Sequence, residues 1–570
     1  MFDLIIRNGL VVDGTGLAGH HADVGVTRGR IAAIGRLNGE AATRTIDAGG
    51  MVVAPGIVDV HTHYDPQVTW DPVCDTSGLH GVTTVVAGNC GFSVAPCRAE
   101  DHGYIAQVFA RVEGMDLSAL NHVDWRFETF PEYLGALDGR LGLNFGMYVG
   151  HSALRRYVMG DACYERASND TERNRIVALT EEAMRAGAMG WSSSKAPVHL
   201  DLADRPVPSR LAGTDELLGM ADAVGRAGGL GSIAYAPESA MEGIDAADRD
   251  LMIDMARRGG VPVITQGLGG RSKTDAPELA WQEASDFLDR SASVGSPVYC
   301  LLMVRGTAGP FTMERGTTRY EGVPLWDELF HLPVDERLRR LRDPDRRAAF
   351  RQAIDNPNRD PAKGTTLPPP HWQTLVVEQA QSAANQALVG QPIAEIAERQ
   401  GRHPADVFFD IAVADELRTV FHWSNETPAW HDVLRRAQRH PQMIVGVSDG
   451  GAHLDRDDGA AWSTHFLRQW WQDEKLWRLE EAIRLMTSVP AAVCGVGERG
   501  LLRPGWFADM MIFDPDALDV DGHLDHDRAT GAARFRNVPK GYRATIVNGV
   551  PVVEHGEVTD ERPGHVVRPI

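Results

Sequence analysis

Two histidines separated by one residue are the clearest candidates for chemistry in this sequence. His61 and His63 follow the apolar run GIVDV at residues 56–60. Side chains at positions i and i+2 of a strand point to the same side, so the two imidazoles converge, as they must to hold one metal ion. Two histidines on a solvent-exposed loop are the alternative. Because the preceding run is typical of a buried strand, we predict that His61 and His63 are metal ligands at its end.

Cys90 and Asp449 also follow segments that read as buried strands. Cys90 comes after TTVVAGN at 83–89, where a thiolate can bind zinc; a small buried apolar side chain is the alternative. Asp449 follows MIVGVS at 443–448. A carboxylate there can bind a metal and accept a proton from water, and a turn-forming Asp-Gly-Gly is the alternative. In a closed eight-stranded barrel the last strand lies beside the first, so Asp449 would reach the two histidines.

The elements that must position these residues alternate between strands and helices. Helical patterns at 171–186, 213–227, 246–258 and 277–293 lie between many of the strand candidates. The strand candidates are 57–61, 82–88, 144–150, 188–193, 231–235, 261–265, 297–304 and 443–448. This order predicts an α/β fold, a (β/α)8 TIM-like barrel over residues 56–499 with its active site at the carboxyl ends of the strands.

The two chain ends and one internal segment depart from this alternation. Short strand patterns with glycine turns at 1–55 and again at 500–570 predict a small β-sandwich domain built from both ends. Residues 306–375 are rich in Arg, Pro and Asp, which predicts an insertion into the barrel. A lid over the active site and a helical decoration are equally compatible with this segment.

Composition excludes several classes of partner. The 570 residues carry 57 Lys and Arg against 78 Asp and Glu, a net charge of −21. Such a surface repels nucleic acid and anionic membranes. The six cysteines form no CxxC motif, no apolar run approaches the length of a membrane span, and Asp3 and Arg7 interrupt what would be a signal peptide. We therefore expect a cytoplasmic protein with a small-molecule partner; a homo-oligomer is left open.

The chain resembles the amidohydrolase superfamily, in a divergent subgroup of its D-aminoacylase (N-acyl-D-amino-acid deacylase) branch. The GNCG run at 88–91 is particular to that branch. The other motifs that carry the resemblance are DLIIRNG at 3–9, PGIVDVHTH at 55–63, GVTTVVAG at 81–88, GHSALR at 150–155, SDGGAH at 448–453 and the tail at 499–509. The resemblance implies a β-sandwich joined to a metal-binding barrel that hydrolyses amide bonds with one or two divalent ions, zinc being favoured.

The resemblance also implies roles for individual residues. His61 and His63 match the metal pair of the first strand, and Cys90 matches the thiolate ligand. Asp449 matches the carboxylate that activates water and then protonates the leaving amine. Family members carry a histidine at the ends of strands five and six, and here strand five has none, while Gln266 stands near the sixth position.

Lys195 follows the fourth strand candidate, where many amidohydrolases have a carboxylated lysine that binds metal. We therefore predict Lys195 as a further ligand; an anchor for a substrate carboxylate is the alternative. His199, four residues on, is a substitute ligand or a substrate contact.

Four more polar residues near strand ends are predicted to contact substrate. They are His151 and Arg155 after strand three, Gln266 after strand six and Arg305 after strand seven. An arginine can pair with the carboxylate of an amino acid through two hydrogen bonds. A structural salt bridge is the alternative for both arginines.

We therefore predict the metal-dependent hydrolysis of an amide C–N bond in a small molecule, an N-acyl (D-)amino acid, with Asp449 as general base and then general acid. A cyclic amide or another small C–N substrate is the alternative, as is a non-catalytic binding protein with the same fold. The run SSSK at 192–195 matches the Ser-x-x-Lys motif of serine acyl hydrolases. That motif opens a helix, whereas here it follows a strand pattern, so a serine nucleophile is disfavoured.

Overall fold

The computed structural model describes residues 1–241, 243–266, 276–304, 308–315, 317–359, 368–424, 426–454 and 459–570. Each strand candidate overlaps a strand of the structure. The four helical patterns are confirmed as α7 (Asp170–Ala186), α8 (Thr214–Arg226), α9 (Ala246–Gly259) and α10 (Pro277–Ser293).

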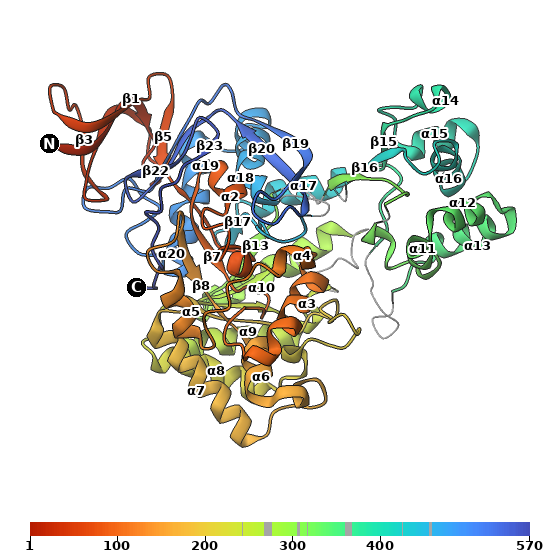
Figure 1. The fold of residues 1–570 in the computed structure, drawn as a ribbon, viewed down its shortest axis with the longest axis horizontal. Coiled ribbons are helices and arrows are strands. Elements are labelled where there is room, and N and C mark those ends of the chain that lie inside the picture. The colour runs from red at the N-terminus through yellow and green to blue at the C-terminus, as the bar shows by residue number, and fades with distance from the viewer. Residues whose placement is uncertain are drawn as a thin grey trace.

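Strands from both chain ends hydrogen-bond into one nine-stranded sheet within the described chain, and these strands lie side by side in Figure 1. The ends meet where β5 (Val52–Pro55) pairs antiparallel with β18 (Met510–Phe513). The other members are β1 (Phe2–Val11), β2 (His20–Thr27), β3 (Arg30–Gly35), β4 (Ala42–Asp47), β21 (Tyr542–Val547), β22 (Val550–Glu554) and β23 (Glu557–Val558). Val24, Val53, Ile512 and Ile546 belong to one buried cluster, so the two ends share a core.

The middle of the chain supplies parallel strands. One parallel sheet has the order β6-β7-β8 and the other the order β17-β13-β12-β11-β10-β9. These strands are β6 (Ile57–Asp59), β7 (Val82–Ala87), β8 (Asn144–Met147), β9 (Val149–Gly150), β10 (Gly190–Ser194), β11 (Ser232–Ala236), β12 (Val263–Gln266), β13 (Val298–Leu302) and β17 (Met443–Val445). Only Tyr148 separates β8 from β9, and a parallel bridge joins Thr62 to Gly450 beyond the ends of β6 and β17. The bridge therefore brings the segment after β6 beside the segment after β17.

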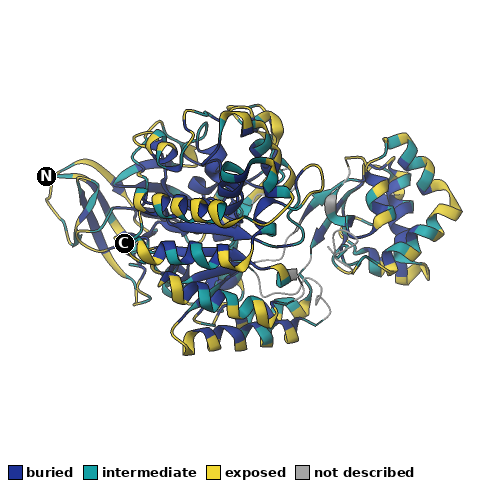
Figure 2. Cartoon of the chain, turned by 90° about the horizontal axis from the view of Figure 1, so that it is seen from below, coloured by how far each residue is buried: buried dark blue, intermediate teal, exposed yellow. Residues whose placement is uncertain are grey.

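The side chains between these strands form one buried cluster. Every parallel strand contributes to this cluster a residue that lies in it or directly beside it, and Tyr148 serves both β8 and β9. These residues are Val58, Val86, Tyr148, Met189, Ala234, Ile264, Leu301 and Ile444. Helices lie outside the strands, and Figure 2 shows their buried faces turned inward and their exposed faces outward. In α7 the buried residues include Ile176, Leu179 and Ala183, which recur at helical spacing. An Asn169–Glu172 capping box starts this helix.

A separate lobe is inserted between β13 and β17 and lies to one side of the parallel strands in Figure 1. Its sheet has the order β14 (Ala308–Phe311), β16 (Val420–Ser424), β15 (Val376–Gln379). Its helices are α11 (Pro324–Phe330), α12 (Val334–Arg342), α13 (Pro344–Asp355), α14 (Ala383–Gln386), α15 (Ile393–Gln400) and α16 (Pro404–Ala414). The lobe has its own core from Met313 to Trp423. The insertion therefore extends beyond the 306–375 segment that the sequence suggests.

No helix among the described residues is long and apolar enough to cross a membrane. All six cysteines are buried free thiols.

A buried polar network joins the terminal sheet to the parallel strands. Asp509 Oδ1 accepts a hydrogen bond from the Asn548 amide at 2.7 Å, and Oδ2 accepts one from Asn144 Nδ2 at 3.1 Å. The Arg499 guanidinium pairs with the same carboxylate. Asn144 opens β8, while Asn548 lies in the turn between β21 and β22. One carboxylate thus connects both parts of the fold.

Replacing this carboxylate is expected to destabilise the whole chain. Asp509→Ala leaves the Arg499 guanidinium buried without its counter-charge, a change that costs about 3–5 kcal/mol of unfolding free energy. The urea midpoint should fall clearly below that of wild type. Asp516→Ala, which removes an exposed carboxylate shortly after the end of β18, is the matched control and should keep the wild-type midpoint. Equal midpoints for the two variants would contradict the role given to Asp509.

Candidate functional site

His61 and His63 lie just beyond the carboxyl end of β6, and both are buried. Their ring centroids are 5.4 Å apart with an interplanar angle of 72°. The His63 amide donates to Gly450 O at 2.8 Å, and Ser448 Oγ donates to His61 O at 3.0 Å. The loop after β17 therefore holds the backbone of both histidines.

Cys90 lies beyond the end of β7, beside the histidines. Its Sγ is 3.7 Å from His61 Nε2. The candidate ligand atoms of His61, His63 and Cys90 all lie within 4.8 Å of one another. Cys90 has a φ of 57°, a left-handed conformation that turns the chain sharply at the strand end.

Asp449 reaches the same point from the end of β17. Its Oδ1 is 3.2 Å from His61 Nε2 and 3.8 Å from His63 Nε2. Burial acts to raise the pKa of Asp449, but the hydrogen bond with His61 and the neighbouring histidines outweigh it and hold this pKa well below its usual range. The carboxylate is therefore the stable form.

Gln266 closes the cluster on the side of β12. Its Nε2 is 2.7 Å from His61 Nε2 and donates to Cys90 Sγ at 3.1 Å. A small pocket at this point is lined by His61, Cys90, Ser193, Ala234, Tyr235, Ala236, Ile264, Gln266 and Leu301. The sequence predicts Gln266 as a substrate contact, and the structure places it against the predicted ligands.

Two residues that the sequence analysis did not single out as site residues also lie here. Glu113 Oε2 is 3.4 Å from His63 Nε2, and His453 Nε2 is 3.9 Å from the same oxygen. Glu113 follows α3 (His102–Val112), in the connection between β7 and β8. A carboxylate at the carboxyl end of a helix interacts unfavourably with the helix dipole, and this position is the feature of the sequence that could have marked Glu113 as a candidate site residue.

The donor set fits a divalent metal ion. Both ring nitrogens of His63 are buried and have no hydrogen-bond partner among the described residues. Burial and the neighbouring His61 lower the pKa of His63, so its imidazole is neutral, as a ligand must be. Burial, with the charges of Glu113 and Asp449, raises the pKa of Cys90 well above its usual range. A thiolate at Cys90 therefore requires a nearby cation, and a His–Cys–carboxylate set suits zinc.

The prediction that His151 and Arg155 contact substrate is corrected by their surroundings. Both are fully buried and pair with Glu216. His151 Nε2 is 2.6 Å from Glu216 Oε1, and Arg155 Nη1 donates to Oε1 and Oε2 at 2.7 and 2.8 Å. Because α6 (His151–Met159) turns them toward α8, they form a structural ion-pair network.

Lys195 and His199 follow the end of β10. The Lys195 ammonium donates to Ala212 O at 3.3 Å and is 3.6 Å from Glu238 Oε2, so it faces these groups instead of the His–Cys cluster. This placement argues against the ligand role predicted for Lys195. The His199 ring packs 5.4 Å from that of Phe92, and its charge contributes to the lowered pKa of His63. Arg305 lies outside the described residues.

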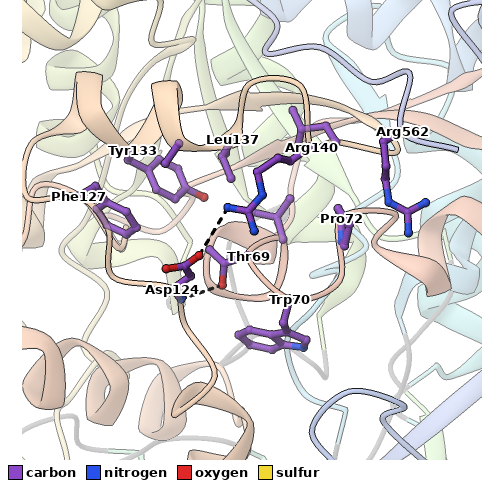
Figure 3. A pocket seen from close by; sticks show the side chains of 12 residues that line it. Thr69, Trp70, Pro72, Asp124, Phe127, Tyr133, Leu137, Arg140 and Arg562 are labelled. Atoms are coloured by element: carbon purple, nitrogen blue, oxygen red, sulfur yellow. Dashed lines mark hydrogen bonds and ion pairs between the residues drawn. The ribbon is translucent and has the colours of Figure 1, made fainter. Parts of the chain in front are cut away.

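A larger cavity of about 300 Å³ lies elsewhere on the molecule, as Figure 3 shows. Its lining includes Trp70, Tyr133 and Leu137. Arg140 Nη1 donates to Asp124 Oδ2 at 3.5 Å, and the Asp124 amide donates to Thr69 Oγ1 at 3.3 Å. The described residues that line this cavity include none of the predicted ligands, so its size does not mark the chemistry.

The chain is similar to several known proteins over most of its length. A model described as the amidohydrolase family matches residues 44–553. The chain is 30% identical over 604 residues to an uncharacterized protein of Mycobacterium tuberculosis (strain ATCC 25618 / H37Rv), covering 96% of this chain and 91% of the relative. It is 29% identical over 581 residues to the D-aminoacylase of Alcaligenes xylosoxydans xylosoxydans, covering 99% and 97%.

A solved structure of D-aminoacylase is also similar. It is described by the role of its binuclear metal centre, with one-metal activation and second-metal attenuation. The TM-score is 0.61 at 25% sequence identity, with 100% of both chains covered.

The Glu216 network is expected to make stability depend on acid pH. Burial acts to raise the pKa of Glu216, but the hydrogen bond and charge of His151, with the charge of Arg155, lower it from 4.5 to about 2. Its contribution is therefore complete above pH ~4.5 and is lost as the pH falls toward ~2.

Glu216→Gln should lower the free energy of unfolding at pH 7 by about 3 kcal/mol, and the difference from wild type should shrink below pH ~4.5. Urea titrations at several pH values measure it. Asp215→Asn, at the exposed neighbouring position, is the control and should match wild type throughout. A pH-independent difference would contradict the assignment.

Proposed function

Because the chain belongs to the amidohydrolase family, we propose that it hydrolyses the amide bond of an N-acyl amino acid, the D-enantiomer being favoured, with a bound zinc ion. The observation that carries this proposal is the convergence of His61, His63, Cys90 and Asp449 beyond the ends of three neighbouring strands. The full-length similarity to a D-aminoacylase supports the substrate class.

We infer that the parallel strands close into an eight-stranded barrel, in which β8 and β9 together count as one strand. The Thr62–Gly450 bridge and the interior cluster with one residue in or beside each strand support this inference. In such barrels the active site lies at the carboxyl ends of the strands, which is where the four candidate residues lie.

His61, His63, Cys90 and Asp449 would hold the ion, which when bound would polarise the substrate carbonyl and lower the pKa of water. The Asp449 carboxylate accepts the proton that water loses as its oxygen bonds to the carbonyl carbon. The same carboxyl group then delivers this proton to the amide nitrogen, the C–N bond breaks, and a carboxylic acid and an amine result.

The chain's own cations would orient the substrate. Arg155 is committed to Glu216 inside the protein, so we propose that Lys195, which follows β10, meets the substrate carboxylate in exchange for its contact with Glu238. A lid over the site and a helical decoration are equally compatible with the inserted lobe, and a cytoplasmic location stays a prediction.

Asp449→Asn should lower kcat/KM for N-acetyl-D-amino acids by about 10²–10⁴-fold, because the amide cannot accept the proton. Purified wild-type protein should contain about one zinc per chain by elemental analysis, and the His61→Ala/His63→Ala double variant should lose it. Circular dichroism checks that each variant is folded.

The assay compares N-acetyl-D-amino acids with their L-enantiomers and with hydantoin. Preferential turnover of hydantoin would replace the proposed substrate by a cyclic amide. If the metal-loaded wild-type protein turned over none of these compounds, the proposal that the chain is an amide hydrolase would be contradicted.

A further inference from the structure

We propose that Glu113 is an additional ligand of this metal site. The inference rests on the proposed function, since it requires that the cluster bind a metal. Glu113 is buried, with 3% of its surface exposed, and follows the last residue of α3. Its carboxylate comes from a helical connection, whereas the other candidate ligands come from strand ends.

The spacing of the donor atoms carries the proposal. Two ligands of one tetrahedral zinc ion lie about 3.2–3.8 Å apart, given bond lengths of about 2.0–2.3 Å to oxygen, nitrogen and sulfur. Glu113 Oε2 is 3.4 Å from His63 Nε2, and Asp449 Oδ1 is 3.2 Å from His61 Nε2. Each carboxylate therefore has one oxygen within the ligand-to-ligand distance of one imidazole nitrogen.

The contacts continue from one donor to the next. Cys90 Sγ is 3.7 Å from His61 Nε2, and Asp449 Oδ1 is 3.8 Å from His63 Nε2. Together with the Glu113–His63 contact, they place five donor atoms beyond the end of β6. The mutual spacing of His61, His63 and Cys90 fits one ion, and Glu113 reaches this group through its contact with His63.

The backbone holds Glu113 in this place. The His453 amide donates to Glu113 O at 2.6 Å, so the end of α3 is tied to the loop that carries Asp449. His453 Nε2 is also 3.9 Å from Glu113 Oε2 and can orient the carboxylate. Burial and the carboxyl end of a helix both disfavour a negative charge, and a cation among the donors would offset this cost.

Glu113→Gln tests the proposal, because it keeps the side-chain shape and the backbone contact. The dissociation constant for Zn²⁺, measured by competition with a chromophoric chelator, should rise by about 10–100-fold or more. The visible spectrum of the Co²⁺-loaded protein should also change, because one ligand is lost. Glu100→Gln, at the exposed other end of the same helical segment, is the matched control and should behave as wild type.

The outcomes separate the two proposals. If Glu113→Gln keeps the wild-type Zn²⁺ affinity and an unchanged Co²⁺ spectrum, the ligand role is overturned. Weaker Zn²⁺ binding with an unchanged Co²⁺ spectrum also overturns it, because Glu113 would then only position the other ligands. If Glu113→Gln does not fold, Glu113→Asp replaces it and should shift the Co²⁺ spectrum. A wild-type chain that binds neither ion overturns both proposals, whereas a chain that binds them without amide hydrolysis overturns only the proposed function.

Discussion

The join between the first and the last parallel strands is the constraint on which the site depends. The Thr62–Gly450 bridge and the hydrogen bond from the His63 amide to Gly450 O bring together segments almost four hundred residues apart in the chain. A Cβ at Gly450 would lie 2.8 Å from the Tyr64 ring, so only glycine allows this approach. Without the join, Asp449 would not face His61 and His63.

Buried polar networks hold the frame around that join. The Glu216 carboxylate binds His151 and Arg155, and the Asp509 carboxylate binds Arg499, Asn144 and Asn548. Each places charge in the interior, where it is stable only while its partners are present. These networks explain why residues of catalytic type occur in the fold without contacting the site.

Local patterns predicted much of the fold and part of the site. Apolar runs and helical spacing are properties of neighbouring residues, and the strands and the helices α7 to α10 follow them. The His61–His63 pair was predictable for the same reason, since residues two apart on a strand share a side. His151 and Arg155 were assigned to substrate because their types suit it, but their partner Glu216 lies about sixty residues further along the chain.

The sequence by itself determined the order of strands and helices, the negative charge and the strand-end positions of His61, His63, Cys90 and Asp449. The tertiary structure alone decided which polar groups meet. It turned Lys195 toward Glu238 and brought Glu113 to His63. Periodicity reports only on residues close in the chain, whereas these contacts depend on how distant segments pack.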